Sequence, residues 1–163
     1  MALGTKITTC NTSIIKIGVN GVNSTDADMK EAANFLNGEY KDEPTVQDVK
    51  PKGTTSGIGI TTYHKYTGKG TWQRTEDDEV QLYLIKLSEG KVGKDCQTKV
   101  SFVGADGITR TGIFNVSATE LGFSGEADAL ATLEVDFAKA SGEITIDYGE
   151  TGDTGDTAEG WDN

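Results

Sequence analysis

The stretch Leu130 to Ile144, LATLEVDFAKASGEI, alternates apolar and polar side chains with a period of two. Such alternation is typical of a β-strand with one buried face and one wet face. The side chains expected to point inward are Ala131, Leu133, Val135 and Phe137. Glu134 and Asp136 then lie on the opposite face, so the stretch predicts the closing strand of a sheet with a packed side and an acidic side.

The composition favours a β-rich chain with one core. The 163 residues fit one domain, and they include 21 glycines but only 2 prolines. This balance suits short strands joined by tight turns. We expect a single domain over residues 1–148 and an acidic, mobile tail over residues 149–163, because a segment of Gly, Asp and Thr cannot offset its chain entropy.

Two further segments carry strand patterns. Ser13 to Val19, SIIKIGV, is a short β-branched run that predicts a first strand. Cys96 to Val116 predicts a hairpin, because Val100 and Phe102 alternate with polar residues before the turn sequence GADG. The following SATELGFSGEADA continues or bends the second strand of that hairpin.

The segment RTEDDEVQLYLIKLSEGK predicts an α-helix. Thr75 is a candidate N-cap, acidic residues fill the first turn, and Lys86 precedes Gly90 at the end. The residues that share one helical face are Val80, Leu84 and Leu87. A strand through Val80, Leu82 and Leu84 is the competing interpretation, and the acidic start favours the helix.

Other segments have weaker patterns. Asp26 to Tyr40 predicts a helical turn or two, capped by Asp26 and stopped by Gly38. Lys41 to Thr55 holds both prolines and predicts a loop. Thr54 to Trp72 predicts strands with a long mobile loop.

No segment presents the pattern of a catalytic site, and we expect no enzyme activity and no cofactor. The only histidine, His64, lies in a Tyr-rich segment without a nucleophile motif, so we interpret it as a surface residue. TGKGT at Thr67 to Thr71 differs from a phosphate-binding loop at Tyr63 and Gly70, and we interpret it as a turn. Cys10 and Cys96 match no metal spacing and predict buried free thiols.

The charge argues against a broad nucleic-acid contact. Fifteen basic and 26 acidic residues give a net charge of −11, which repels a phosphate backbone. The acidic groups at Asp26 and Asp28, at Glu76 to Glu79 and in the tail do not follow a calcium-loop spacing, so no metal site is predicted. The N-terminus lacks a signal-peptide core, and no window is long and apolar enough to span a membrane.

The order of elements in the second half resembles the phage major tail proteins, which are the subunits of the tail tube. In that family a helix is followed by a strand, a short DG turn, a long strand, and a last strand ending near a phenylalanine and a Ser-Gly pair. The matching positions here are Asp77 to Leu87, Lys99 to Val103, Asp106-Gly107, Thr111 to Phe123, and Leu133 to Ile144. The resemblance runs over residues 71–146, and the first 70 residues match only as strand, long loop and strand.

The resemblance implies a mainly β fold: a β-sandwich or half-barrel of antiparallel sheets flanked by one α-helix, with a long loop and mobile termini. It also implies a structural protein of the virion, made in the bacterial cytoplasm. Copies of it would join into hexameric rings that stack into the tail tube. Its partners would be further copies of itself, a tape-measure protein, and tail terminator and baseplate proteins, and DNA would pass without specific binding. Glu134 and Asp136 would then face either the channel or the outer water.

Two other functions remain open at the level of the sequence. One is a phage head decoration or tail-completion protein, which would share the β-rich core but would not polymerise. The other is an immunoglobulin-like adhesive or carbohydrate-binding module, in which Tyr63, Tyr66 and Trp72 would form an aromatic platform.

Overall fold

The computed structural model describes residue 9, residues 12–123 and residues 125–149, and the chain is mainly β within them. The strands are β1 (Ile14–Gly18), β2 (Met29–Glu31), β3 (Phe35–Val49), β4 (Ile58–Gln73), β5 (Gln97–Val103), β6 (Thr109–Leu121) and β7 (Thr132–Asp147). The helix is α1 (Glu79–Ser88). Three short 3-10 turns lie at Gly21–Asn23, Asp26–Asp28 and Gly93–Cys96.

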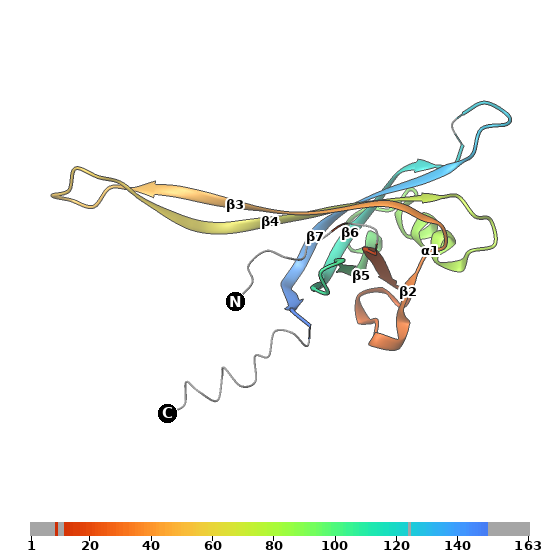
Figure 1. Ribbon diagram of the computed structural model, residues 1–163, viewed down its shortest axis with the longest axis horizontal. Coiled ribbons are helices and arrows are strands. Elements are labelled where there is room, and N and C mark those ends of the chain that lie inside the picture. Colours follow the sequence, from red (N-terminus) through yellow and green to blue (C-terminus); the bar gives the residue numbers. More distant parts are fainter. Residues whose placement is uncertain (1–8, 10–11, 124, 150–163) are drawn as a thin grey trace.

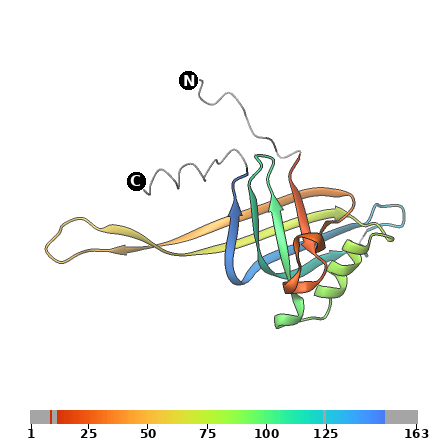
Figure 2. The same ribbon diagram turned by 90° about the horizontal axis from the view of Figure 1, so that it is seen from below.

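All seven strands belong to one antiparallel sheet in the order β2-β1-β5-β6-β7-β4-β3. The sheet curls, so that β3 and β4 cross behind β1, β5, β6 and β7 (Figure 2). The two layers of the expected sandwich are therefore two halves of one continuous sheet. The prediction of a mainly β fold with one flanking helix is confirmed.

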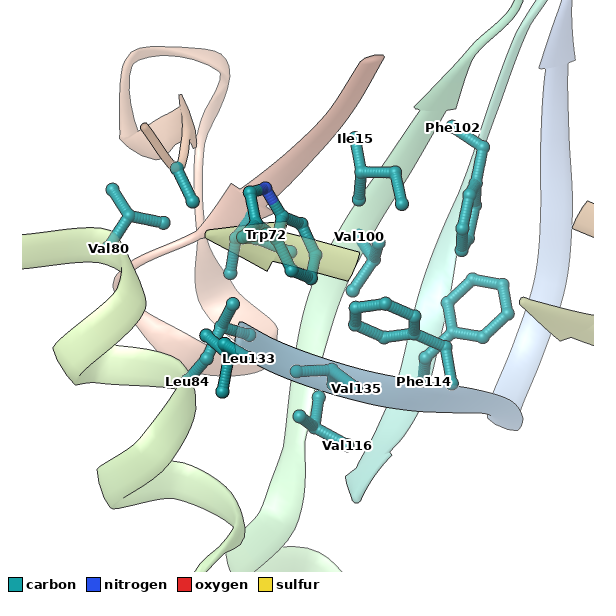
Figure 3. Close-up of a cluster of buried hydrophobic side chains, with 13 residues drawn as sticks. Ile15, Trp72, Val80, Leu84, Val100, Phe102, Phe114, Val116, Leu133 and Val135 are labelled. Atoms are coloured by element: carbon teal, nitrogen blue, oxygen red, sulfur yellow. The ribbon is translucent and has the colours of Figure 1, made fainter. Parts of the chain in front are cut away.

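The core lies between the two halves of the sheet and under the helix (Figure 3). Its fully buried side chains include Trp72, Phe114, Phe137, Ile17, Leu84, Leu133, Val100, Val116 and Val135. Phe102 meets Phe114 and Phe137 edge-on, with ring centroids 5.3 and 5.6 Å away. Edge-to-face packing of this kind adds stability beyond the buried area, so the aromatic cluster anchors the two halves of the sheet.

Helix α1 closes one end of the core. It begins after Asp78, whose carboxylate accepts a hydrogen bond from the Gln81 N–H at 3.0 Å, and Asp78 therefore takes the N-cap place predicted for Thr75. Val80 and Leu84 are buried, whereas Leu82 is 39% exposed. This spacing belongs to a helix and excludes the alternative strand.

Gln81 is a fully buried polar residue that ties three segments together. Its side-chain N–H₂ donates to the Ala33 carbonyl at 2.8 Å and to the Gln73 carbonyl at 2.9 Å. Its side-chain oxygen accepts from the Thr75 N–H at 2.8 Å. The amide thereby satisfies backbone groups at the start of β3 and the end of β4, where neither strand continues.

The segment TGKGT is part of β4, and its interpretation as a turn was wrong. Gly68 and Gly70 face the core, and a Cβ at Gly68 would lie 2.4 Å from Phe102, while one at Gly70 would lie 2.4 Å from Trp72. The two glycines are required because aromatic rings occupy the space above the strand.

Two other predictions fail in the first half of the chain. Asp26 to Tyr40 forms a 3-10 turn, β2 and the start of β3 rather than a helix. Lys41 to Thr55 is strand as far as Val49, and only the remainder connects β3 to β4. Pro44 misled the prediction, because an edge strand such as β3 tolerates a proline.

The elements predicted for the second half of the chain are confirmed. Helix α1 forms, and β5 and β6 make the predicted hairpin around the GADG turn. The last strand also forms, as β7. The predicted acidic tail falls on residues 149–163, which lie outside the described residues except for Gly149.

Candidate assembly interface

Strands β3 and β4 extend far beyond the rest of the sheet (Figure 1). β4 pairs with β7 only from Thr67 to Gln73, whereas its pairing with β3 continues to Val49 and Ile58. We name the two-stranded part, residues 41–66, the arm. Nine residues of β3 at about 3.3 Å each give the arm a length of about 30 Å.

The arm carries exposed apolar side chains near its tip. Val46, Val49, Ile58, Ile60 and Tyr63 are between 40% and 62% exposed. Isolated exposed apolar residues are common, but a group of them on a ribbon without a core is typical of a contact surface.

A β-bulge divides the arm into two parts. Thr45 pairs with Tyr63 and Val46 pairs with Thr61, so Thr62 is an extra residue on β4. Because side chains alternate along each strand, the apolar residues that share one face of the arm are Val49, Ile58, Ile60 and Tyr63. This face continues the surface of the sheet that points away from the core, which we name the outer face.

The outer edge of β3 is open along its whole length. β3 is the last strand of the sheet order, and it spans 15 residues. β6 is also open on one side, since its pairing with β5 ends at Asn115 and β6 itself runs on to Leu121. A long open edge is a template for pairing with another strand, so the four-stranded part β6-β7-β4-β3 is suited to extension on both sides.

Glu134 and Asp136 lie on the outer face of this four-stranded part. Glu134 lies opposite Thr71 and Asp136 opposite Lys69, and Lys69 Nζ is 3.6 Å from Glu134 Oε1. Lys41 pairs with Glu39 at 3.0 Å on the same face, and this contact raises the pKa of Lys41. The face is therefore a pattern of carboxylates with interspersed lysines and not a uniformly acidic surface.

The structure places Leu133, Val135 and Phe137 in the core, each no more than 1% exposed. Val135 lies opposite Gly70, and Phe137 lies opposite Gly68. Sequence reasoning missed Lys69 beside Glu134, because β4 was not recognised as the neighbour of β7.

Comparisons with known proteins give matches at the level of structure alone. No family model matches the sequence, and no curated protein matches it. One chain from the virion of a native gene transfer agent particle aligns with a TM-score of 0.60 at 14% identity, over 86% of this chain and 99% of that one. The tail tube of SPP1 aligns with a TM-score of 0.57 at 11% identity, over 83% of this chain and 78% of that one.

This chain has a tail-tube-like fold. A third solved structure, the tube-terminating cap of an anti-feeding prophage, aligns with a TM-score of 0.54 at 12% identity, over 90% of this chain and 94% of that one. The resemblance to tail proteins noted in the second half of the sequence is thus confirmed for the fold and extends to the first half. The tail-tube-like fold is shared by tubes and by the proteins that end them.

A second surface of this tail-tube-like chain lies in the angle between the arm and the end of β7. A cleft of about 340 Å³ is lined by Tyr40, Asp42, Tyr66, Arg110, Ile146 and Tyr148. The Arg110 guanidinium lies 5.4 Å from the centre of the Tyr40 ring. Burial raises the pKa of Tyr40 to about 12, so its hydroxyl keeps its proton at neutral pH.

The aromatic platform expected for a carbohydrate-binding module is absent from the described residues. Trp72 is fully buried in the core, whereas Tyr63 is exposed near the arm tip. Tyr66 faces Tyr40 on the opposite side of the arm from Tyr63, with ring centroids 6.2 Å apart. The three side chains therefore share no surface.

His64 lies on the arm, as a surface residue. Its Nδ1 is 2.7 Å from Asp42 Oδ1, and its ring stacks on Tyr66. Cys96 is a buried free thiol, and Cys10 lies outside the described residues.

Two of the acidic side chains, Asp28 and Asp78, have local structural roles. Asp28 accepts a hydrogen bond from the Thr25 N–H at 3.0 Å, and this bond lowers the pKa of Asp28. Asp78 caps α1. Within residues 9, 12–123 and 125–149, no group of three metal-ligating side chains is found, and no helix is long and apolar enough to cross a membrane.

Proposed function

We propose that this chain is a structural subunit of a tail tube, assembled as stacked rings through which DNA passes. The observation that carries the proposal is the tail-tube-like fold, which covers most of this chain and most of each matched chain. The tail of the gene transfer agent particle has C6 symmetry, and its chain aligns with a TM-score of 0.56 at 15% identity. A hexameric ring is therefore the first assembly to test.

The open edges supply a mechanism for ring closure. The β3 edge of one copy joins the open β6 edge of the next, so that the four-stranded parts form a closed wall. Closure satisfies the backbone groups of β3 that have no strand partner on their outer side in the single subunit. The arm, about 30 Å long by its strand rise, then reaches a neighbouring copy or ring through its apolar tip.

The outer face of the four-stranded part lines the channel in this arrangement. Glu134 and Asp136 would then project toward passing DNA, and the nearby lysines are held by carboxylates. Paired lysines offer few free charges for counterion release, so the wall does not retain the phosphate backbone. A tape-measure protein, a terminator and baseplate proteins remain proposed partners, and we propose no catalytic activity and no cofactor.

Electron microscopy of the purified full chain tests this function. Rings and tubes of constant diameter are expected as the protein concentration rises. A variant in which residues 46–62 are replaced by Asn-Gly keeps the Thr45 and Tyr63 pair as the end of the hairpin and removes the tip. It should remain folded without forming tubes, while Thr61→Ala, on the opposite face of the arm from Ile60, should assemble normally. A full chain that stays monomeric at all concentrations contradicts the proposal.

A tube-terminating protein is the second candidate, in line with the tail-completion alternative. The matches to the anti-feeding prophage cap and to a sheath/tube terminator of an extracellular contractile injection system each cover 90% of this chain. A terminator forms one ring that caps a tube and does not extend. Size-exclusion chromatography with microscopy separates the two functions, since discrete single rings at high concentration favour the terminator.

A further inference from the structure

An apolar groove of about 160 Å³ lies between the start of β1 and the edge of β3. Its apolar lining comes from Ile14 and Ile15 of β1, Phe35 and Tyr40 of β3, and Phe102 and Val103 of β5. Glu39 is the one charged residue of the lining and already pairs with Lys41. The groove is thus an open apolar surface with an acidic rim.

The groove exists because β1 and β3 approach each other without pairing. Ile15 Cδ1 lies 3.5 Å from the place that a Cβ on Gly38 would take, but no β1–β3 pairing appears among the described strands. The two strands belong to opposite halves of the curled sheet (Figure 2). A segment laid between them would cover apolar side chains from both halves.

The continuous described part of the chain begins at Thr12, so eleven residues precede it. Ser13 is itself part of the groove wall. Thr12 lies in a turn, and Ser13 separates it from the start of β1 at Ile14. Thr8, at the end of residues 1–8, therefore lies five residues before Ser13, a span of at most about 17 Å of extended chain.

The two chain ends differ in their fit to this groove. No acidic residue occurs before Asp26, and Leu3, Thr5 and Ile7 share one face of an extended segment while Lys6 lies on the other. The opposite end carries Glu150, Asp153, Asp156, Glu159 and Asp162. Only the amino-terminal segment combines apolar side chains at alternate positions with an attachment point in the groove wall.

We propose that the groove binds the chain's own amino-terminal segment, residues 1–8, with Leu3 and Ile7 against the apolar lining. Attachment to the groove wall gives this segment a high effective concentration there, so it outcompetes the same segment of another copy. The cover forms in the single subunit and does not depend on tube formation.

Hydrogen exchange on the full chain tests the contact. Ile7→Asp should speed the exchange of backbone amides in residues 35–40 and 102–104 at least tenfold. Thr8→Asp adds the same charge one residue along, on the other face of the segment, and should leave these amides unchanged. Equal exchange in the wild type, Ile7→Asp and Thr8→Asp overturns the proposal.

Cross-linking identifies which chain supplies the segment. In a Cys10→Ser background, Ile7→Cys with Val103→Cys should form a disulfide faster than Thr8→Cys with Val103→Cys. Mixing isotope-labelled and unlabelled chains separates links within one chain from links between two. Links within one chain support the proposal, whereas mixed-mass links show that a second copy fills the groove and overturn it. Microscopy of the same samples tests tube formation separately. A failure of the tail-tube proposal can therefore be distinguished from a failure of the groove proposal.

Discussion

The body of the sheet and the arm contain the same two strands in different surroundings. In the body, β4 lies between β3 and β7, and its inward residue Trp72 is fully buried. In the arm, β4 pairs with β3 alone, and Ile58 and Tyr63 are more than half exposed. An isolated two-stranded ribbon is marginal in water, so the body stabilises the subunit while the arm offers surface to a partner.

This contrast separates the residues that stabilise the subunit from the residues that serve assembly. Substitutions in the body should change the free energy of unfolding of the subunit, because its side chains contact each other across the sheet. Substitutions in the arm should change association with little change in that free energy. Each of the following variants tests this separation.

Trp72→Ala should give the largest effect. Removing a fully buried indole that packs on Phe35 and lies over Gly70 should lower the free energy of unfolding by about 3–5 kcal/mol. Urea denaturation measures the change. Tyr63→Ala on the arm is the control and should stay within about 0.5 kcal/mol. Comparable losses in both variants would remove the distinction between body and arm.

Gln81→Leu should lower the free energy of unfolding by about 2–3 kcal/mol. The leucine fills similar space but leaves the Ala33 and Gln73 carbonyls without the amide donors that reach them at 2.8 and 2.9 Å. Gln47→Leu on the arm, where the side chain is exposed, serves as the matched control. An unchanged free energy of unfolding in Gln81→Leu would mean that other groups donate hydrogen bonds to these carbonyls.

Ile60→Asp should raise the protein concentration needed for tube formation about tenfold, since a charge replaces an apolar contact worth at least about 1.4 kcal/mol. Light scattering against concentration measures this threshold. Thr61→Asp adds the same charge on the opposite face of the arm and should shift the threshold less. Urea denaturation should show both variants within about 0.5 kcal/mol of the wild type. A lower free energy of unfolding in Ile60→Asp would show that Ile60 stabilises the subunit and would contradict its assignment to assembly alone.

Asp136→Lys should leave subunit stability nearly unchanged and make assembled tubes retain DNA. The substitution places a lysine beside Lys69 on the proposed channel wall. Filter binding at rising salt measures retention, which should fall steeply as salt screens the contact. Asp95→Lys makes the same change of charge at an exposed position in a turn away from that wall and is the control. If tubes of Asp136→Lys do not retain DNA at low salt, this face lies on the outer surface of the tube and not on the channel wall.

Asp28→Ala should produce the smallest effect, and one that depends on pH. The Thr25 N–H holds the pKa of Asp28 below its ordinary value of 3.8. The carboxylate therefore contributes stability above that value, and the contribution is lost as pH falls through the lower folded pKa. The urea midpoints of wild type and variant should begin to converge as the pH falls below about 4 and should meet only below the folded pKa of Asp28. Asp26→Ala on the same turn controls for the loss of charge.

The sequence predicted the elements whose pattern is local. The last strand, the GADG hairpin and the helix all have apolar spacing that matches their geometry. β3 and β4 lack that signal for a physical reason. Their core-facing positions include Gly38, Gly68 and Gly70, which lie under the rings of Phe35, Phe102 and Trp72, and beyond Tyr66, toward the arm tip, neither face of the ribbon has a core.

The candidate interface was predicted only in part for the same reason. Alternation within β7 placed Glu134 and Asp136 on one face, but the lysine beside them comes from β4, 65 positions before Glu134 in the chain. Such pairing depends on sheet topology, which a single sequence does not display. The open edge of β3 likewise follows from strand order and not from any residue pattern.

The bulge at Thr62 has a consequence for how the arm can change length over evolution. Because Thr62 is the extra residue, its deletion would keep Tyr63 and Ile60 on one face. A deletion of one residue between Ile58 and Ile60 would instead turn one of these side chains to the opposite face. Relatives of this chain with longer or shorter arms should therefore differ by paired residues on the two strands, with odd changes concentrated at the bulge.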